Sequence, residues 1–194
     1  IVEHIIDRFL NIGSKHFYLS VNYKSKILKA YFEELKPKYK ISFIEEKWPL
    51  GTAGSLNLLK NQVEGPFFVT NCDIIIKADL ESLLKFHLKN KYDITLVASN
   101  KEYIIPYGTC KLNKEGHLSH IMEKPQYDLL INTGLYLLNQ EVIKMVPENK
   151  FFNFTDLIDK MIKSGGKVGV FPIDETNWID VGQWGEYKNA IKFF

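Results

Sequence analysis

An uncharged apolar stretch that ends in an acid, residues 66–73 with the sequence PFFVTNCD, decides how this chain is expected to fold. Its first five residues are rich in β-favouring side chains and predict a buried strand. In open α/β sheets ligands bind where such strands end, and this strand delivers Asp73 to that edge. A second acid, Asp180, ends the apolar run of WIDVG at residues 178–182.

These two aspartates predict a shared metal site. Mg²⁺ takes one or two carboxylates and keeps several waters, so Asp73 and Asp180 are together an expected protein ligand set. The alternative for each residue taken alone is structural, with Asp73 turning the chain and Asp180 capping a helix.

Strand and helix patterns alternate on both sides of this stretch. Strands are predicted at 16–21, 40–44 and 93–98, with helical patterns between them. This alternation predicts an α/β fold with a mixed, mainly parallel sheet and helices on both faces. Residues 108–112 and 118–122 flank a turn-rich segment and predict an inserted β-hairpin.

Further elements follow from the same periodicities. They are helices at 27–35, 80–87 and 154–162, strands at 129–131, 135–138 and 167–171 (the last strand), and a terminal helix with Trp184, Tyr187, Ile191 and Phe194 on one face. The chain begins inside a helical pattern, without a methionine or an N-cap before Ile1. We therefore expect a single domain, residues 1–194, that lacks an upstream segment.

Composition restricts the classes of function. A net charge of +2 without a basic block argues against a nucleic-acid partner. Cys72 and Cys110 are too few for a disulfide framework and lack metal-site spacing, which predicts a reducing cytoplasm. No uncharged apolar run approaches the roughly 20 residues that cross a bilayer, and charges interrupt the first eight residues, so neither a membrane span nor a secretory signal is expected.

Two further motifs could contact a ligand. Gly51-Thr52-Ala53-Gly54 is predicted between a strand and a helix, where missing Cβ atoms and free backbone N–H groups would let a ligand approach closely. Loops of this composition are more often only loops. Lys124, in the sequence EKP, offers a cation to a phosphate, although most surface lysines are only solvated.

In chain order these motifs resemble the sugar-1-phosphate nucleotidyltransferases, which join a nucleoside triphosphate to a sugar 1-phosphate. The resemblance covers nearly the whole chain and rests on six motifs: PLGTAG (49–54), NCD (71–73), YG (107–108), EKP (123–125), NTG (132–134) and WIDVG (178–182). It implies a Rossmann-like fold, a cytoplasmic enzyme that uses Mg²⁺, and a soluble chain that could form a homo-oligomer.

The resemblance also implies a role for each motif residue. Asp73 and Asp180 would hold Mg²⁺ and would act as catalytic residues together with Lys124, which would meet the sugar phosphate. The implied nucleotide-binding residues are Gly51, Thr52, Gly54, Asn71 and Asp73. The implied sugar-phosphate-binding residues are Tyr107, Gly108, Glu123, Lys124, Asn132 and Gly134. Polar groups of this kind discriminate between sugars because a missing hydroxyl leaves a buried partner unpaired.

The sequence departs from the family pattern in two places. Cys72 stands where the family commonly has glycine. The family also begins with a strand and a Gly-rich loop, whose Arg and Lys grip the triphosphate, and this sequence contains neither. We therefore expect a central first strand to be missing and the chain as given to be weakly active or inactive.

Other functions are less well supported by the sequence. A nucleotidyltransferase-like sensor that binds a sugar nucleotide without catalysis is favoured by the missing loop, but retention of both aspartates and Lys124 disfavours it. A glycosyltransferase would be expected to contain a compact Asp-x-Asp, and none occurs. His117 and His120 lack a third ligand, and Glu45-Glu46 would point to opposite faces of a strand, so neither pair predicts a site.

Overall fold

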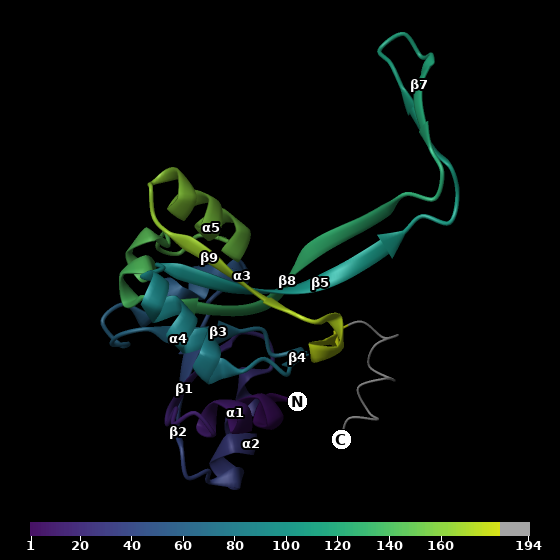
Figure 1. Ribbon diagram of the computed structural model, residues 1–194. Helices are drawn as coiled ribbons and strands as arrows, with labels where there is room; N and C mark the ends of the chain where they lie inside the picture. Colours follow the sequence, from purple (N-terminus) through teal and green to yellow (C-terminus); the bar gives the residue numbers. More distant parts are fainter. Residues whose placement is uncertain (183–194) are drawn as a thin grey trace.

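The central sheet has the strand order β3-β8-β5-β9 (Figure 1). A computed structural model of the protein describes residues 1–182. In it β3 (Phe67–Thr70), β5 (Ile94–Ile104) and β9 (Val168–Ile173) run in one direction, and β8 (Gln126–Leu138) runs in the opposite direction between β3 and β5. The predicted α/β fold with a mixed, mainly parallel sheet is therefore confirmed.

Helical elements cover both faces of this sheet. Side chains of a strand alternate between faces, and the two apolar cores follow that alternation. Tyr136 and Leu138 pack with α5 (Phe154–Lys163) in one core. Leu135 and Leu137 pack in the other core, together with residues of α1 (Val2–Leu10) and α4 (Leu80–Asn90). The short 3₁₀ helices η1 (Ser55–Leu59) and η2 (Gln140–Met145) add side chains to the first core.

The helix predicted at 80–87 is confirmed as α4, which has a side-chain cap at its start and a buried histidine. Asp79 caps the helix by accepting a hydrogen bond from the Ser82 N–H at 3.0 Å. His87 is fully buried and bonds to Thr95 Oγ1 at 2.8 Å and to Asn139 Oδ1 at 3.1 Å. The bonds explain how a polar ring is accommodated within an apolar stripe.

Two parallel strands, β1 (His16–Val21) and β2 (Lys40–Glu45), pair beside the central sheet. The Tyr18 hydroxyl of β1 donates to the Gln62 carbonyl oxygen, in the turn between η1 and β3, at 2.8 Å. Within residues 1–182, β1 and β3 each have a paired strand on one edge only. The helix predicted at 27–35 is confirmed as α2 (Ser25–Leu35), in which Phe32 is the buried residue.

Two short strands were missed by the sequence patterns. β4 (Ile74–Ile76) pairs antiparallel with β10 (Trp178–Asp180), which follows η3 (Glu175–Asn177). The prediction that residues 167–171 form the last strand is therefore wrong. Three residues are too few to establish a periodicity, and pairing between residues about a hundred positions apart is a tertiary property. The predicted helix that contains Trp184 lies outside the described residues.

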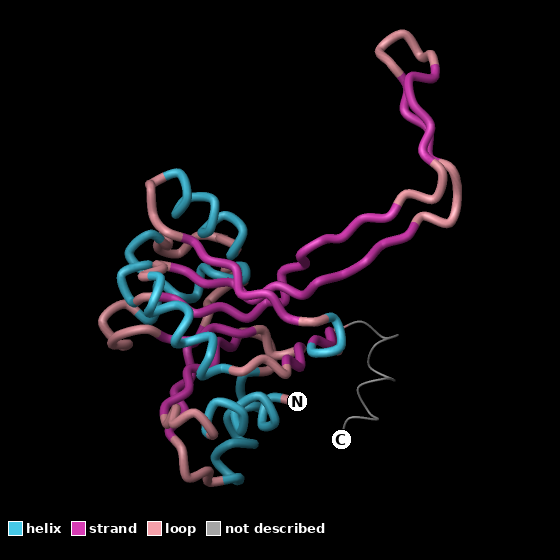
Figure 2. The backbone as a smooth tube through the Cα atoms, viewed as in Figure 1, coloured by secondary structure: helices cyan, strands magenta, loops and turns pink. Residues whose placement is uncertain are grey.

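A two-stranded ribbon leaves the central sheet and ends in a hairpin (Figure 2). β5 and β8 stay paired from Ala98↔Asn132 to Ile104↔Gln126, and β6 (Thr109–Leu112) pairs with β7 (Leu118–Met122) beyond them. We call residues 100–131 the arm. The predicted hairpin is confirmed, whereas the two strands predicted at 129–131 and 135–138 form one continuous strand.

None of the helices within residues 1–182 is both long enough and apolar enough to cross a membrane.

Candidate metal and nucleotide site

The β4–β10 ladder brings Asp73 and Asp180 together. Asp73 directly precedes β4, Asp180 ends β10, and the Val181 N–H donates to the Asp73 carbonyl oxygen at 2.9 Å. A Cβ atom added to Gly182 would lie 2.8 Å from Asp73 Oδ2 and 3.1 Å from Asp180 Oδ1. Both carboxylates therefore face one small space that the missing side chain of Gly182 leaves open.

This arrangement fits a hard divalent cation. Carboxylate oxygens are the ligands that Mg²⁺ prefers, and one or two of them suffice when water and substrate phosphates complete the shell. Within residues 1–182 there is no cluster of three or more His, Cys, Asp or Glu side chains that could hold a metal ion. The structure thus offers two protein carboxylates at this position, and their role as metal ligands stays a prediction.

An open pocket lies beside the two aspartates. It encloses about 440 Å³, part of it open to solvent. Its lining includes five predicted site residues, which are Asn71, Asp73, Asn132, Gly134 and Asp180. The remaining lining residues are Ile74, Thr133, Tyr136 and Trp178. The structure therefore gathers residues of three sequence motifs around one cavity.

Asn71 and Gly134 are in close contact within this pocket. The Asn71 N–H donates to the Gly134 carbonyl oxygen at 3.0 Å. Gly134 has φ +84°, a left-handed conformation that favours glycine, and an added Cβ would lie 2.7 Å from Asn71 Nδ2. Glycine at position 134 is thus required both by the backbone and by the neighbouring amide.

Hydrogen bonds to two neighbours fix the Asn132 side chain. Its Nδ2 donates to the Tyr136 hydroxyl at 2.7 Å, and its Oδ1 accepts from the Gly134 N–H at 3.1 Å. An amide carries two N–H donors, so one of them remains to bond a ligand hydroxyl. Tyr136 is itself held by stacking on Phe154, with ring centroids 3.8 Å apart, and burial raises the pKa of its hydroxyl.

Trp178 is a pocket residue to which the sequence gave no role. Among the described residues its indole Nε1 is a buried donor without a hydrogen-bond acceptor. Buried donors are nearly always paired, which makes this one notable at the edge of a ligand-sized pocket. Trp178 belongs to the motif WIDVG, of which the sequence patterns assigned a role only to Asp180.

The Gly51–Gly54 turn forms the single-turn helix α3 and packs against residues 150–153. The N–H groups of Ala53 and Gly54 both donate to the Phe152 carbonyl oxygen, at 2.9 and 3.0 Å. A Cβ on Gly51 would lie 2.7 Å from that same oxygen. The expectation of free N–H groups is therefore wrong for Ala53 and Gly54, because close approach of the chain itself explains these glycines.

Thr52 connects α3 to the start of α5. Its N–H donates to Asn153 Oδ1 at 3.3 Å, and its Oγ1 accepts from the Phe154 N–H at 3.0 Å. The Phe154 N–H lies in the first turn of α5, where backbone donors have no acceptor within the helix. Thr52 supplies that acceptor. None of Gly51, Thr52 and Gly54 lines the pocket beside the aspartates, and nucleotide binding by them stays a prediction.

The remaining predicted residues lie together on the arm and not in the pocket. Tyr107 is 74% exposed. A Cβ on Gly108 would lie 3.1 Å from Glu123 Oε2, so these two positions are neighbours. Lys124 follows directly, with φ +42°. The structure therefore separates the predicted sugar-phosphate residues into a pocket group and an arm group.

Cys72, next to Asp73, is exposed and free. Partial burial of its sulfur raises the pKa of the Cys72 thiol, and the negative charge of Asp73 raises it further. The thiol form is thus favoured beside the aspartates, and no sign of an activated nucleophile is present there.

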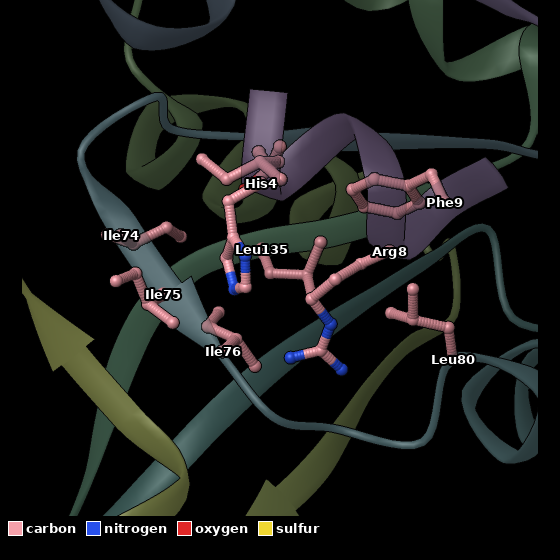
Figure 3. A pocket seen from close by; sticks show the side chains of 10 residues that line it. His4, Arg8, Phe9, Ile74, Ile75, Ile76, Leu80 and Leu135 are labelled. Carbon is pink, nitrogen blue, oxygen red and sulfur yellow. The ribbon is translucent and has the colours of Figure 1, made fainter. Parts of the chain in front are cut away.

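A second, mainly apolar pocket lies between α1 and β4 (Figure 3). His4 and Arg8 reach from α1 across β4, and Arg8 Nη2 donates to the Ala78 carbonyl oxygen at 2.7 Å. Burial lowers the pKa of Arg8 from its ordinary value. This bond ties α1 to the loop before α4, so we regard Arg8 as a structural residue that the sequence did not reveal.

The family and the relatives that match this chain are all nucleotidyltransferases. The family described as "Nucleotidyl transferase" matches residues 1–194. The catalytic subunit beta of mannose-1-phosphate guanylyltransferase from Dictyostelium discoideum is 30% identical over 205 residues, which cover 98% of this chain and 56% of that protein. The chain thus spans little more than half the length of that curated relative.

Solved structures show the same fold. HddC from Yersinia pseudotuberculosis has a TM-score of 0.73 and 26% identity, and the match covers 98% of this chain and 84% of that one. A second structure of HddC is complexed with GMP-PN and matches with a TM-score of 0.71 and 25% identity over 100% of this chain and 85% of that one. A putative glucose-1-phosphate thymidylyltransferase from Bacillus anthracis matches with a TM-score of 0.74 over 99% of this chain and 81% of that one, and its 15% identity supports the fold alone.

Proposed function

Because the chain belongs to the nucleotidyl transferase family, we propose that it serves to transfer a nucleoside monophosphate from a nucleoside triphosphate to a sugar 1-phosphate. The products are a nucleotide sugar and pyrophosphate. The observation that carries this proposal is the shared space between Asp73 and Asp180, which Gly182 leaves open. The name of the Dictyostelium discoideum relative, mannose-1-phosphate guanylyltransferase, supports the class of substrate.

The chemistry explains the need for this arrangement. Both reactants are anions, so attack of a sugar phosphate oxygen on the α-phosphorus requires neutralised charge and fixed alignment. A bound Mg²⁺ supplies Lewis acidity and a template for the phosphates. Asp73 and Asp180 hold the cation, and the pocket beside them receives the substrate.

Other residues of the chain position the substrate. Asn132 offers one amide N–H in a fixed orientation, since Tyr136 and Gly134 hold the rest of its side chain. Lys124 supplies the cation for the sugar phosphate, and Glu123 accepts from sugar hydroxyls. The two exposed free cysteines support a reducing compartment, which we propose is the cytoplasm.

A non-catalytic sensor that binds a sugar nucleotide remains the second candidate. The observation that favours it is the position of Lys124 and Glu123 on the arm, away from the two aspartates. Metal-independent binding of a sugar nucleotide, with no pyrophosphate release, would identify the sensor.

Replacing either Asp73 or Asp180 with Asn tests the metal assignment. We expect each variant to lose Mg²⁺-dependent nucleotide binding and, where the unaltered chain releases pyrophosphate, to lose that turnover by two orders of magnitude or more, in line with the roughly 10² to 10³-fold cost of removing one charge-stabilising group. Nucleotides and sugar 1-phosphates are screened by pyrophosphate release, and binding is followed by calorimetry.

Asp174→Asn is the matched control. Asp174 lies six residues before Asp180, is exposed and does not line the pocket. It should behave as the unaltered chain does. Full activity or unchanged metal-dependent binding in the Asp73 or Asp180 variant would refute the metal site.

A further inference from the structure

One continuous chain of contacts joins the Gly51–Gly54 turn to the pocket beside the two aspartates. It runs from Thr52 through Phe154 and Tyr136 to Asn132. Thr52 is a predicted nucleotide-binding residue that does not line the pocket, whereas Asn132 is a predicted sugar-binding residue that does. The two aromatic residues are the packed groups that lie between them.

The backbone of Phe154 holds the turn. Phe154 is the first residue of α5, and its N–H donates to Thr52 Oγ1 at 3.0 Å, while the Thr52 N–H donates to Asn153 Oδ1 at 3.3 Å. A threonine hydroxyl keeps its donor when its oxygen accepts, so the exposed Thr52 side chain has an O–H to offer a ligand. The start of α5 therefore sets the position of that hydroxyl.

The ring of Phe154 holds the opposite end of this chain of contacts. It stacks on the Tyr136 ring with centroids 3.8 Å apart and an interplanar angle of 5°. Both residues are buried in the core that also contains Ala53 of the turn. Protein interiors are close-packed and their side chains sit in rotamer minima, so the stack cannot shift without displacing its neighbours.

Tyr136 in turn fixes the direction of the Asn132 amide. Its hydroxyl accepts from Asn132 Nδ2 at 2.7 Å, and the Gly134 N–H donates to Asn132 Oδ1 at 3.1 Å. The amide group is planar, so holding one donor and the oxygen also sets the direction of the remaining N–H. Loss of the Tyr136 hydroxyl, or a shift of its ring, would leave that N–H poorly aimed into the pocket.

We infer that Phe154 is a positioning residue shared by both parts of the site. Its backbone N–H sets the Thr52 hydroxyl, and its ring sets the Asn132 amide through Tyr136. A ligand bound at one end therefore alters the other end, so that the nucleotide and the sugar 1-phosphate affect each other's binding. That consequence rests on the proposed function, whereas the link between the four residues can be measured without a substrate.

The side-chain amide signal of Asn132 gives a substrate-free measurement. Asparagine is labelled with nitrogen-15, and the signal is assigned by its loss in Asn132→Ser. Tyr136→Phe removes only the hydroxyl, and Phe154→Leu removes the ring but keeps the backbone N–H. Thr52→Val replaces the acceptor oxygen with a methyl group, whereas Thr52→Ser keeps that oxygen. Circular dichroism confirms that each variant is folded.

We expect the Asn132 signal to move toward that of a solvent-exposed asparagine in Tyr136→Phe and Phe154→Leu. Its exchange with water should become roughly 2- to 10-fold faster, the size of one net hydrogen bond. Thr52→Val should produce a smaller change in the same direction, and Thr52→Ser should leave the signal in place. Phe171→Leu is the matched control, because it removes a partly buried ring from the other core, and it should not move the signal.

Three results would overturn the inference. The first is an unchanged Asn132 signal in Tyr136→Phe or Phe154→Leu. The second is an unchanged signal in Thr52→Val, which would show that the turn does not influence the pocket. The third is an equal change in Phe171→Leu, which would indicate a general loosening of the fold.

Kinetics separate this inference from the proposed function. Where the unaltered chain releases pyrophosphate, Phe154→Leu should raise the KM for the sugar 1-phosphate by roughly 2- to 10-fold and change kcat less, because the lost hydrogen bond weakens ground-state and transition-state binding alike. A moved amide signal without any effect on KM, or without pyrophosphate release by the unaltered chain, would count against the proposed function only.

Discussion

At the scale of single residues, Gly182 controls how closely a cation can approach both carboxylates. A methyl group there would contact Asp73 Oδ2 and Asp180 Oδ1 at 2.8 and 3.1 Å. Gly182 is not among the residues with positive φ, so alanine introduces no backbone strain. We predict that Gly182→Ala weakens metal binding on the order of tenfold, the lower end of the 10 to 100-fold loss known for residues that support metal ligands.

Titration with Mg²⁺ or Mn²⁺ by calorimetry measures this effect. The urea midpoint of Gly182→Ala should stay close to that of the unaltered chain, because Gly182 is exposed. The atoms nearest to the added methyl group all belong to the carboxylates of Asp73 and Asp180. Gly134→Ala is the contrasting variant, since its positive φ and its contact with Asn71 should lower the midpoint. Unchanged metal affinity in Gly182→Ala would show that the cation does not bind between the two aspartates.

At the scale of elements, β8 has two different environments along one strand. Its inner half is buried, with Leu137 fully inaccessible, whereas Leu129 on its outer half is 45% exposed. We predict that Leu137→Ala lowers the free energy of unfolding by about 2–5 kcal/mol, the range for core Leu→Ala substitutions. Leu129→Ala should change it by less than about 0.5 kcal/mol in the isolated chain, as for exposed positions.

Urea denaturation followed by tryptophan fluorescence compares the two variants. It is carried out at a concentration where sedimentation shows single chains, so that association does not contribute to the stability of the arm. Equal losses from both substitutions would show that the outer half of β8 is buried within one chain, which would contradict the arm as an exposed ribbon.

At the scale of the whole molecule, we predict that stability falls on acidification in two stages. The pKa of His16 is lowered by burial and by the charge of Lys40. As the pH falls, His16 is therefore protonated more readily in the unfolded chain than in the folded chain, and stability decreases below about pH 6.5. The pKa of Asp79 is lowered by its bonds to Ser82, and that of Glu45 by Lys29. These carboxylates stabilise the fold above about pH 4 and lose that effect below it.

Thermal unfolding between pH 3 and pH 8 tests this profile. Asp79→Ser keeps an N-cap without a titrating group, so its acid stage should be smaller than that of the unaltered chain. A stability that rises as the pH is lowered from 6.5 to 5 would contradict the assignment of His16.

Much of the fold was predictable because local periodicity specifies element type. The apolar run at residues 93–98 predicted the inner part of β5, and the apolar spacing at residues 80–87 predicted α4. The hairpin of β6 and β7 was likewise predictable from its turn residues. α2 shows what local periodicity does not specify. A helical stripe of apolar residues indicates an apolar face but not what covers that face, and in α2 only Phe32 is buried.

By itself the sequence determined that this is an α/β chain of the nucleotidyl transferase family, and it identified Asp73 and Asp180 as the residues of interest. Only the tertiary structure decided that these aspartates face one space, because that depends on pairing between two three-residue strands, β4 and β10. It likewise showed that the Gly51–Gly54 turn bonds to Phe152 and that the continuous β5–β8 ladder carries Lys124 away from the pocket. Local patterns record the neighbours of a residue along the chain, whereas strand pairing and packing bring distant segments together.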